Sequence, residues 1–557
     1  MNCVRKLIVR CSWLLAAAFV AAVSGCCACK CGGAKVDAEG FAWYSNADIG
    51  LAGPANPGDF YVLRYEHPSR TPFPEGDSRR AFGIKWNFVE VRQLKDSVTI
   101  VEDGVLSTSD RRIPGINWRK RLPSKSRNVR IKFVDEGYSL AEDGKAEAPE
   151  GFTSLFNGKD LSGWRGCSTE DKFNSPRIRR AMIPEVRWAH QAKADELMKE
   201  HWHVRDGVLF FDGLKGGYNI AAEKDYGNME VIADWRLLRV YGDSGFYIRS
   251  MPQVQIWDPN MWNGLGSGCI WNNSSALFSA SACADNPIGS WNRCRMRMIG
   301  SRISVWLNGV KVVDDVEYQN CLVPGKPIPL IDRFELQCHG DPVEFRNIFI
   351  RELPEDPADV PDPSKAVRGE RIDLLADGMD GWEATDPNAR MGWSLKDGVL
   401  SNDTGIDPEK TSRGGAGTTG LRTKRADFYD FDLSCDVLVP LKSNSGIYLR
   451  GRYEIQVLDS FGRGNTDCHY MGALYDLIEP TASAEKPAGE WQHIDMTVYR
   501  RHLTVTLNGV KIIDNKPIPG VTPGAIDGDE FVPGPILLQG DHSNASFRNM
   551  VLTPIVK

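Results

Sequence analysis

The sequence has few of the features that indicate a membrane-spanning, nucleic-acid-binding or zinc-binding protein. The N-terminal apolar run, residues 13–23, is shorter than the roughly 20 residues of a membrane-spanning helix. Positive charge is not in excess, since the formal net charge is −6, and we therefore expect no nucleic-acid partner. Metal-binding cysteine pairs are also lacking, because the cluster of Cys27, Cys29 and Cys31 has no second cluster with ligand spacing. A zinc site is therefore not indicated.

The composition that is present describes an ordinary globular protein. Hydrophobic residues make up 42% and charged residues 25% of the 557 residues, which argues against a largely disordered chain. A chain of this length fits about three domains of the usual size.

The N-terminus has the layout of a secretory signal peptide over residues 1–25. Basic residues precede the apolar run, which ends in Val23-Ser-Gly-Cys26. This ending resembles the bacterial lipobox, so we expect Cys26 to carry a lipid and residues 26–35 to form a tether. The protein would then be anchored to the membrane of the bacterial cell envelope, facing the periplasm or the outer membrane; a plain signal peptide is the alternative. Export also permits disulfides, with Cys269–Cys283 as one candidate pair whose formation the sequence does not determine.

An internal repeat organises the chain from residue 151 onward. The segment Ser244-Gly-Phe-Tyr-Ile-Arg249 returns as Ser445-Gly-Ile-Tyr-Leu-Arg450, and Leu307-Asn-Gly-Val-Lys311 returns as Leu507-Asn-Gly-Val-Lys511. The nearly constant offset of about 200 residues indicates a tandem duplication of a whole domain. We place the first unit at 151–353, a proline-rich linker at 354–369 and the second unit at 370–557. Residues 36–140 form a β-rich region for which the sequence indicates no role.

Hairpin signals predict the architecture of both units. Alternating apolar residues flank Asn308-Gly309 and Asn508-Gly509, and Asn-Gly favours a tight turn because both positions accept positive φ. Many short strands with polar turns predict an all-β antiparallel sandwich in each unit. The first unit also carries an insertion in which residues 185–200 predict an amphipathic helix.

The stretch from Tyr453 to Asp459 carries the chemistry of most interest. Apolar residues at 453, 455 and 457 alternate with Glu454 and Gln456, which is the period of a strand with one buried face. A carboxylate in the middle of a strand requires solvent, a partner or a ligand. A salt-bridged surface strand is the alternative to a functional site.

Several motifs, in order along both units, resemble one known family. They are Phe152–Trp164, Ser445–Arg450, Tyr453–Ser460, Gly472-Ala-Leu-Tyr475, Pro535–His542 and Phe547-Arg-Asn549. The chain is similar to the 3-keto-disaccharide hydrolases, also described as 3-keto-glucoside 1,2-lyases and 3-keto-2-hydroxy-glucal hydratases. The resemblance implies two tandem concanavalin-A-like jelly-roll sandwiches that bind a sugar on the concave sheet. It also implies cleavage of 3-keto-glycosides by base-promoted 1,2-elimination, hydration or both, and a partner sugar 3-oxidoreductase that installs the ketone.

The implied reaction needs a base, a proton donor and positive charge near a developing enolate. We expect Glu454 to be the base and His542 its acid–base partner, since the pKa of histidine lies near working pH. A divalent metal ion is a possible Lewis acid according to the resemblance, with Glu454 and His542 as possible ligands. We expect Gln456 to orient a substrate hydroxyl, and either Arg450 or Arg548 to face the developing negative charge. Asp459 is a second carboxylate. The structural alternatives are a turn cap for His542 and Asp459 and an ion pair for Arg548.

The first unit departs from this pattern. Gln253 occupies the position of Glu454, and a glutamine cannot act as a general base. His339 lies one place before the position of His542. We expect this unit to bind substrate through Arg249, Gln253, Gln255, Asp258 and His339, either without chemistry or for another half of the reaction.

Two other functions are compatible with the same residues. One is ordinary retaining glycoside hydrolysis, because Glu454, Gln456 and Asp459 have the spacing of the three acids in such sandwich enzymes. Gln456 departs from that pattern, since it stands where the second acid would be. The other is a non-catalytic carbohydrate-binding lipoprotein, which the missing acid of the first unit favours.

Overall fold

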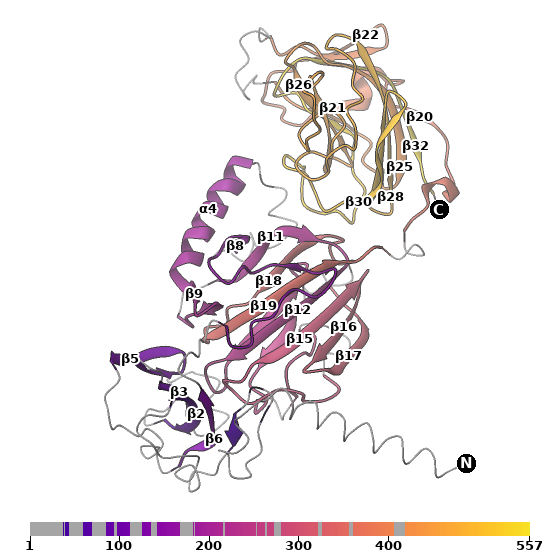
Figure 1. Ribbon diagram of the computed structural model, residues 1–557. Coiled ribbons are helices and arrows are strands. Elements are labelled where there is room, and N and C mark those ends of the chain that lie inside the picture. The colour runs from indigo at the N-terminus through magenta and orange to yellow at the C-terminus, as the bar shows by residue number, and fades with distance from the viewer. Residues whose placement is uncertain are drawn as a thin grey trace, which may run out of the picture.

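The computed structural model shows three β-rich units in chain order (Figure 1). It describes residues 37, 39, 41–43, 60–69, 85–93, 97–111, 125–134, 142–167, 182, 184–214, 218–251, 253–261, 265–271, 280–320, 326–355, 360–405 and 418–556. The expected signal peptide, lipid-modified Cys26 and tether lie outside these ranges. No helix among the described residues is long and apolar enough to span a membrane.

The N-terminal unit is a six-stranded antiparallel sheet. Its strands are β1 (Ala42–Trp43), β2 (Phe60–Pro68), β3 (Trp86–Gln93), β4 (Ser97–Glu102), β5 (Val105–Arg111) and β6 (Arg127–Val134), in the order β1-β6-β2-β3-β4-β5. Leu63, Val91 and Ile131 are buried in its small core. The expected β-rich region is therefore a single meandering sheet.

The first repeat is a sandwich of an eight-stranded and a five-stranded sheet. The larger sheet contains β9 (Trp202–Arg205), β10 (Val208–Phe211), β12 (Met229–Leu237), β15 (Asn292–Ile299), β16 (Arg302–Leu307), β17 (Val310–Glu317) and β19 (Val343–Glu352), with β7 (Thr153–Ser154) added to β19. The smaller sheet has the order β14 (Gln253–Trp257), β13 (Asp243–Ile248), β18 (Asp332–Leu336), β11 (Ile220–Tyr226) and β8 (Trp164–Gly166).

The second repeat has the same two sheets. The larger one contains β22 (Trp393–Lys396), β23 (Val399–Asn402), β25 (Phe431–Leu438), β28 (Trp491–Tyr499), β29 (His502–Leu507), β30 (Val510–Pro517) and β32 (Ala545–Pro554), with β20 (Ile372–Asp373) added to β32. The smaller one has the order β21 (Trp382–Ala384), β24 (Leu421–Thr423), β31 (Leu537–Leu538), β26 (Asn444–Leu449) and β27 (Tyr453–Leu458). Two 3-10 helices, η5 (Pro363–Lys365) and η6 (Gly378–Gly381), lie near its start.

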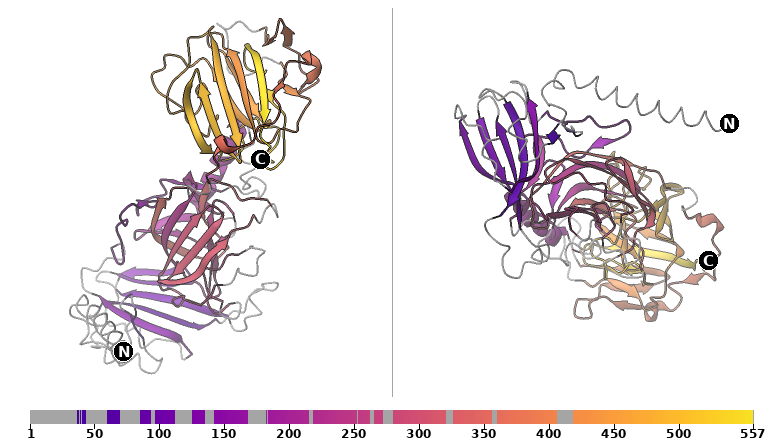
Figure 2. Two further views of the ribbon diagram at one scale, coloured as in Figure 1. Left: turned by 90° about the vertical axis from the view of Figure 1, so that its right-hand side faces the viewer. Right: turned by 90° about the horizontal axis from the view of Figure 1, so that it is seen from below.

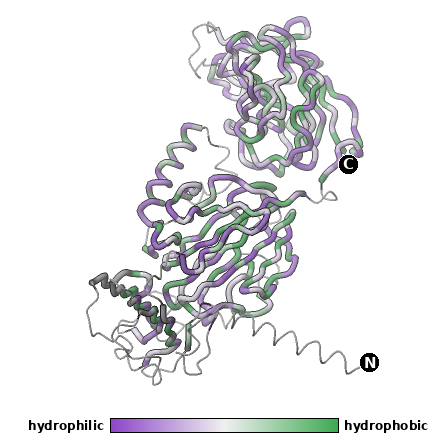
Figure 3. The backbone as a smooth tube through the Cα atoms, in the orientation of Figure 1, coloured by the Kyte–Doolittle hydropathy of each residue, from purple (hydrophilic) through white to green (hydrophobic). Residues whose placement is uncertain are grey.

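Identical strand order in the two repeats shows that the duplication preserved the whole sandwich. The order β17-β16-β15-β12-β19-β10-β9 in the first repeat corresponds to β30-β29-β28-β25-β32-β23-β22 in the second. Each repeat encloses its own hydrophobic core, and hydrophobic and hydrophilic stretches alternate along the chain in both (Figure 3). The all-β class and the tandem sandwiches expected from the sequence are confirmed.

The Asn-Gly hairpins form as predicted. Asn508 and Gly509 join β29 to β30 with φ of 50° and 83°, and Asn308 and Gly309 join β16 to β17 with the same values. Positive φ at both positions explains the requirement for this dipeptide, because most side chains disfavour that backbone region.

The predicted helix of the insertion is also present as α4 (Pro184–His201). Its apolar face is shorter than the amphipathic pattern suggested, since Ala194 and Met198 in its second half are buried while Val186 and Trp188 in its first half are exposed. The first half of α4 extends beyond the sandwich that holds its second half (Figure 1).

The three units follow one another in a row (Figure 2). Buried ion pairs join the N-terminal sheet to the first repeat. Glu90 of β3 accepts hydrogen bonds from Arg64 at 2.6 Å and Arg92 at 2.7 Å, and from Arg236 of the first repeat at 3.3 Å. The three arginines surround the Glu90 carboxyl and hold its pKa well below the usual value, against the opposing effect of burial. Arg236 also binds Glu344.

The cysteines of the described ranges are free thiols. Cys269 is buried and Cys283 is exposed, and neither forms a disulfide. The candidate Cys269–Cys283 pair is therefore wrong.

We predict that Glu90→Ala destabilises the N-terminal sheet by about 3–5 kcal/mol, because it leaves three buried arginines without their shared partner. Urea unfolding followed by circular dichroism measures the change. The matched control is Glu142→Ala, which removes a carboxylate from an exposed ion pair with Lys145 and should cost less than about 1 kcal/mol. Equal effects of the two substitutions would contradict this role of Glu90.

Candidate active site

The outer face of the five-stranded sheet in the second repeat gathers the polar residues predicted for β27. Tyr453, Ile455 and Val457 point into the hydrophobic core. Glu454 pairs across the strands with Tyr448, and Gln456 pairs with Gly446. Because side chains alternate along a strand, Glu454 and Gln456 lie on the face opposite the core.

Glu454 is a buried carboxyl group with a strongly raised pKa. Its side chain lies over Gly446, where an added Cβ would come within 2.3 Å of Oε1, so a larger residue at that position would displace the Glu454 side chain. The Tyr448 hydroxyl donates a hydrogen bond to Glu454 Oε2 at 2.7 Å. Burial raises the pKa of Glu454 to about 8, although the Tyr448 hydrogen bond and the charge of His542 oppose the shift. Glu454 therefore titrates within the range useful for proton transfer.

His542 follows β31 and lies close enough to Glu454 for each charge to shift the other's pKa. Its Nδ1 lies 2.8 Å from Asp541 Oδ1. The hydrogen bond to Asp541 raises the pKa of His542 above its usual value despite the opposing effect of partial burial. An acid–base pair thus spans β27 and the segment after β31.

A loop at residues 466–478 runs along β27, the strand that carries Glu454. The Tyr475 backbone N–H donates to the Glu454 carbonyl at 3.0 Å, and Gln456 Nε2 donates to the His469 carbonyl at 3.1 Å. The rings of His469 and Tyr475 meet edge to face at 5.1 Å. Burial and the charge of Glu454 raise the pKa of Tyr475. The side chain of Gln456 therefore holds the loop by its backbone.

Two buried oxygen atoms on the same face have no hydrogen-bond partner among the described residues. They are Asn444 Oδ1 at the start of β26 and Gln539 Oε1 after β31. A buried acceptor without a donor costs free energy, and a hydroxyl-rich ligand would supply the missing donors.

The corresponding residues of the first repeat satisfy one another instead. Gln253 Nε2 donates to Gln337 at 3.1 Å and also to Gln255, and Gln255 Nε2 donates to Asp243 at 2.5 Å. His339 Nδ1 lies 3.7 Å from Asp243 Oδ2, and burial raises the pKa of Asp243 to about 6. The first repeat thus has a polar network in place of the pair formed by Glu454 and His542.

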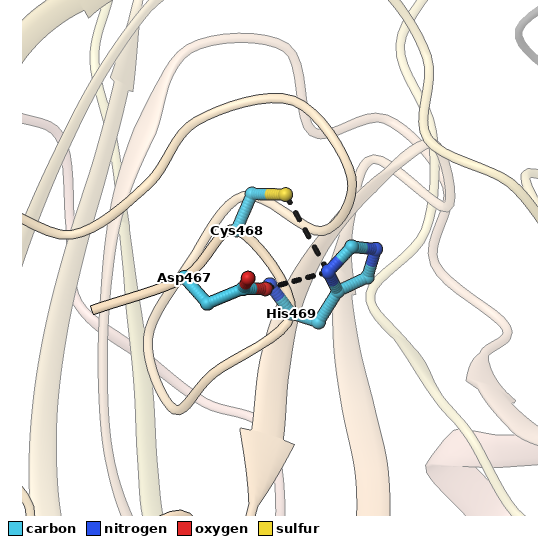
Figure 4. Close-up of side chains that lie close together, drawn as sticks. All are labelled: Asp467, Cys468 and His469. Atoms are coloured by element: carbon cyan, nitrogen blue, oxygen red, sulfur yellow. Dashed lines mark hydrogen bonds and ion pairs between the residues drawn. The ribbon is translucent and has the colours of Figure 1, made fainter. Parts of the chain in front are cut away.

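One loop in the second repeat has side chains suited to a divalent metal ion. Ligand atoms of Asp467, Cys468 and His469 all lie within 4.8 Å of one another (Figure 4). His469 Nδ1 is 2.6 Å from Asp467 Oδ1 and 3.5 Å from Cys468 Sγ. Oxygen, sulfur and imidazole nitrogen donors together suit a transition metal such as Zn²⁺. Burial raises the pKa of the Cys468 thiol to about 11, so an ion would have to displace its proton.

Arg450 and Asp459, expected to be catalytic, and Arg548, expected to bind substrate, have structural contacts instead. Arg548 is on the larger sheet, where it binds Asp436 at 3.0 Å and covers the Trp491 ring. The buried Arg450 donates to the Tyr453 hydroxyl and the Glu530 carbonyl, so it supports the hairpin between β26 and β27. Asp459 accepts a hydrogen bond from the Lys442 backbone at 2.8 Å and caps a turn.

Two residues expected to bind substrate in the first repeat also have structural contacts. Arg249 donates to the Pro329 and Leu330 carbonyls, and burial lowers its pKa to about 10. Asp258 accepts from the Tyr241 and Asn260 backbones. Both side chains therefore hold backbone segments.

Sequence reasoning assigned no role to Tyr448, Tyr475, Asp541 or Gln539. The signal for Tyr448 was available, because the hairpin register places it opposite Glu454. The other three depend on loops brought together by the fold.

Both sandwiches match one known family of protein domains. Residues 151–351 and 372–553 match the 3-keto-alpha-glucoside-1,2-lyase-like domain, so by class the protein is a carbohydrate-processing enzyme. The match covers more than half of the chain and both sandwiches. The chain belongs to the 3-keto-alpha-glucoside-1,2-lyase-like family.

Similar solved structures include two candidate glycosyl hydrolases from Parabacteroides distasonis. One is 22% identical, with 37% of this chain and 95% of that chain covered and a TM-score of 0.27. The other is 30% identical, with 34% and 83% covered and a TM-score of 0.25. No curated protein matches the chain.

We predict that Tyr448→Phe moves the titration of the Glu454 carboxyl above its value of about 8, because the lost O–H donor stabilises the charged form. Carbon-13 NMR of glutamate-labelled protein measures the titration midpoint. Tyr429→Phe, a tyrosine beside Arg450, is the control and should leave that midpoint in place. A downward shift in Tyr448→Phe would refute the assigned hydrogen bond.

Proposed function

We propose that the second repeat cleaves 3-keto-glycosides by 1,2-elimination, with Glu454 as base and His542 as proton donor. The observation that carries the proposal is the buried Glu454 carboxyl, with a pKa of about 8, on the outer sheet face and within electrostatic reach of the His542 imidazole. The family match supports the substrate class.

The elimination begins at the sugar C2. A ketone at C3 acidifies the C2 hydrogen, and Glu454 takes it as a proton. The electrons of the broken C2–H bond form a C1=C2 double bond, and the C1–O1 bond breaks. His542 in its cationic form gives a proton to O1, so the aglycone leaves as an alcohol. Addition of water across the double bond then completes a net hydrolysis.

The environment of each group suits its role. A base with a pKa near 8 is stronger than an ordinary glutamate, and base and acid each contribute about 10²–10⁴-fold in such reactions. The hydrogen bond to Asp541 keeps His542 cationic at higher pH than usual. Cationic His542 also supplies positive charge near the developing enolate. Arg450 and Arg548 do not supply it, because their side chains bind other groups of the repeat.

We propose that Asp467, Cys468 and His469 hold the divalent ion that the family resemblance implies. When bound, such an ion supplies Lewis-acid polarisation. The His469 carbonyl is tied to Gln456, which connects this loop to the sheet face that carries Glu454.

For the first repeat we propose sugar binding without chemistry. Its amide network lacks a glutamate at position 253, and Gln253, Gln255 and Gln337 already bond one another. Weak binding of hydroxyl-rich ligands is the expected property. Retaining glycosidase action in the second repeat is less well supported, because Asp459 caps a turn; rapid hydrolysis of glycosides that lack the ketone would favour it.

The cellular setting is likewise proposed. Lipidation at Cys26 would anchor the enzyme to the envelope membrane. A sugar 3-oxidoreductase must install the ketone, because elimination from C1 and C2 needs an acidified C2 hydrogen.

Replacing Glu454 tests the proposed chemistry. We expect Glu454→Gln to reduce the rate of aglycone release from a 3-keto-glucoside by about 10²–10⁴-fold, because the amide cannot accept the C2 proton. Release of the aglycone and formation of the unsaturated sugar are measured by chromatography. Glu490→Gln, which alters an exposed carboxylate of the same repeat, should retain full activity. Undiminished turnover by Glu454→Gln would rule out its role as base.

Metal content tests the proposed ion site. Cys468→Ala should lower the zinc or cobalt retained after dialysis from about one ion per chain toward zero, because it removes one of three ligands. Cys283→Ala, which removes an exposed thiol of the first repeat, is the control. Equal metal content in both variants, measured by plasma mass spectrometry, would contradict the assignment.

A further inference from the structure

Helix α4 belongs to the first repeat but reaches the second. Its second half is fixed to the first sandwich, where Ala194 and Met198 are buried and Gln191 donates to the Gly166 carbonyl at 2.9 Å. Its first half continues past that sandwich toward the second repeat (Figure 1). The helix lies in an insertion that the second repeat lacks, because Trp164 and Asp206 are farther apart in sequence than Trp382 and Asp397.

An ion pair joins the first half of α4 to the loop at residues 466–478, which runs along β27. Arg187 of α4 donates to Asp476 Oδ2, and both side chains are largely shielded from solvent. Asp476 Oδ1 lies 3.5 Å from His469 Nε2, and the Asp476 backbone N–H donates to the Cys468 carbonyl at 3.0 Å. Arg187 therefore contacts the loop at residues 466–478 near its C-terminal end.

Glu185, in the first turn of α4, faces the same site. Its negative charge helps to raise the pKa of both His542 and Tyr475, while the charge of Arg187 lowers that of Tyr475. Two side chains near the start of α4 thus lie within electrostatic reach of the second repeat: Glu185 acts on His542 and Tyr475, and Arg187 acts on Tyr475.

Trp188 is the exposed aromatic residue nearest to these contacts along the helix. It follows Glu185 by three positions, so both side chains lie on one side of α4. The indole is 62% exposed, although burial of a tryptophan is strongly favourable. An exposed aromatic ring on this part of α4 offers an apolar face on which the C–H face of a sugar ring can stack.

We propose that α4 of the first repeat completes the site of the second repeat: Arg187 holds the loop at residues 466–478, and Glu185 and Trp188 form a subsite for the sugar unit attached to O1. The inference rests on the proposed function for the identity of that sugar. The tandem arrangement then has a purpose that a single sandwich could not serve, because one repeat supplies a wall of the other's substrate site.

Hydrogen–deuterium exchange tests the shared site without reference to activity. Arg187→Ala should increase exchange in residues 466–478 of the second repeat, because the loop loses its ion pair with α4. Lys193→Ala, an exposed lysine on the same helix, should leave exchange in that loop unchanged. Unchanged exchange in Arg187→Ala would overturn the proposed contact.

Kinetics with two substrates test the subsite. Trp188→Ala should raise KM about three- to tenfold for a 3-keto-disaccharide, which has a sugar at O1, and leave KM for methyl 3-keto-glucoside unchanged. Trp188→Phe should retain most of the affinity, and Trp271→Ala, at an exposed tryptophan of the first repeat, should change neither KM. Equal KM changes for the two substrates, or none, would overturn the subsite.

The two hypotheses fail in different ways. If the wild-type protein turns over neither substrate, the proposed function is wrong, and the same comparison is made with dissociation constants from titration calorimetry. Loss of disaccharide binding in Trp188→Ala would then still support the subsite, and unchanged binding would refute it.

Discussion

The site depends on one constraint: a carboxyl group placed in the middle of a strand and kept from water. Burial makes the charged form of Glu454 unfavourable and raises its pKa to about 8. Two residues of the sheet accommodate the buried carboxyl. The Tyr448 hydroxyl donates a hydrogen bond to it across the hairpin, and Gly446, which has no side chain, leaves room for it. His542 lies within electrostatic reach of the carboxyl, and the loop at 466–478 runs along β27. Strand pairing fixes Tyr448 and Gly446 beside Glu454, so the raised pKa of Glu454 depends on the sandwich.

The duplication gave two scaffolds with different tasks. In the second repeat, Asn444 and Gln539 keep buried oxygens without partners among the described residues, as a ligand site would. In the first repeat, Asp243, Gln253 and Gln255 bond within one network. That repeat instead carries α4 and is fastened through Arg236 and Glu90 to the N-terminal sheet. It therefore acts as the structural centre of the chain.

Local patterns in the sequence predicted the fold because they reflect local physics. Alternation around Glu454, positive φ at Asn508-Gly509 and the repeated motifs each depend on neighbouring residues. The catalytic group was predicted less completely. Arg548 follows Phe547, which faces the core, so the sequence indicates that Arg548 points outward. That it lies on the larger sheet, and not on the sheet of Glu454, is decided by the long-range pairing of β32. The contact of Arg187 with Asp476 joins residues far apart in sequence, and no periodicity within α4 encodes it.

The most direct test of the central claim is the fate of the C2 hydrogen. A 3-keto-glucoside incubated with the protein in heavy water, beside a protein-free control, is followed by NMR as the aglycone leaves. Elimination and rehydration predict that the released 3-keto-sugar carries deuterium at C2, because Glu454 removes that hydrogen and solvent replaces it. Release of the aglycone with the C2 hydrogen retained would contradict the account, because the bond to O1 would then have been cleaved without a base at C2.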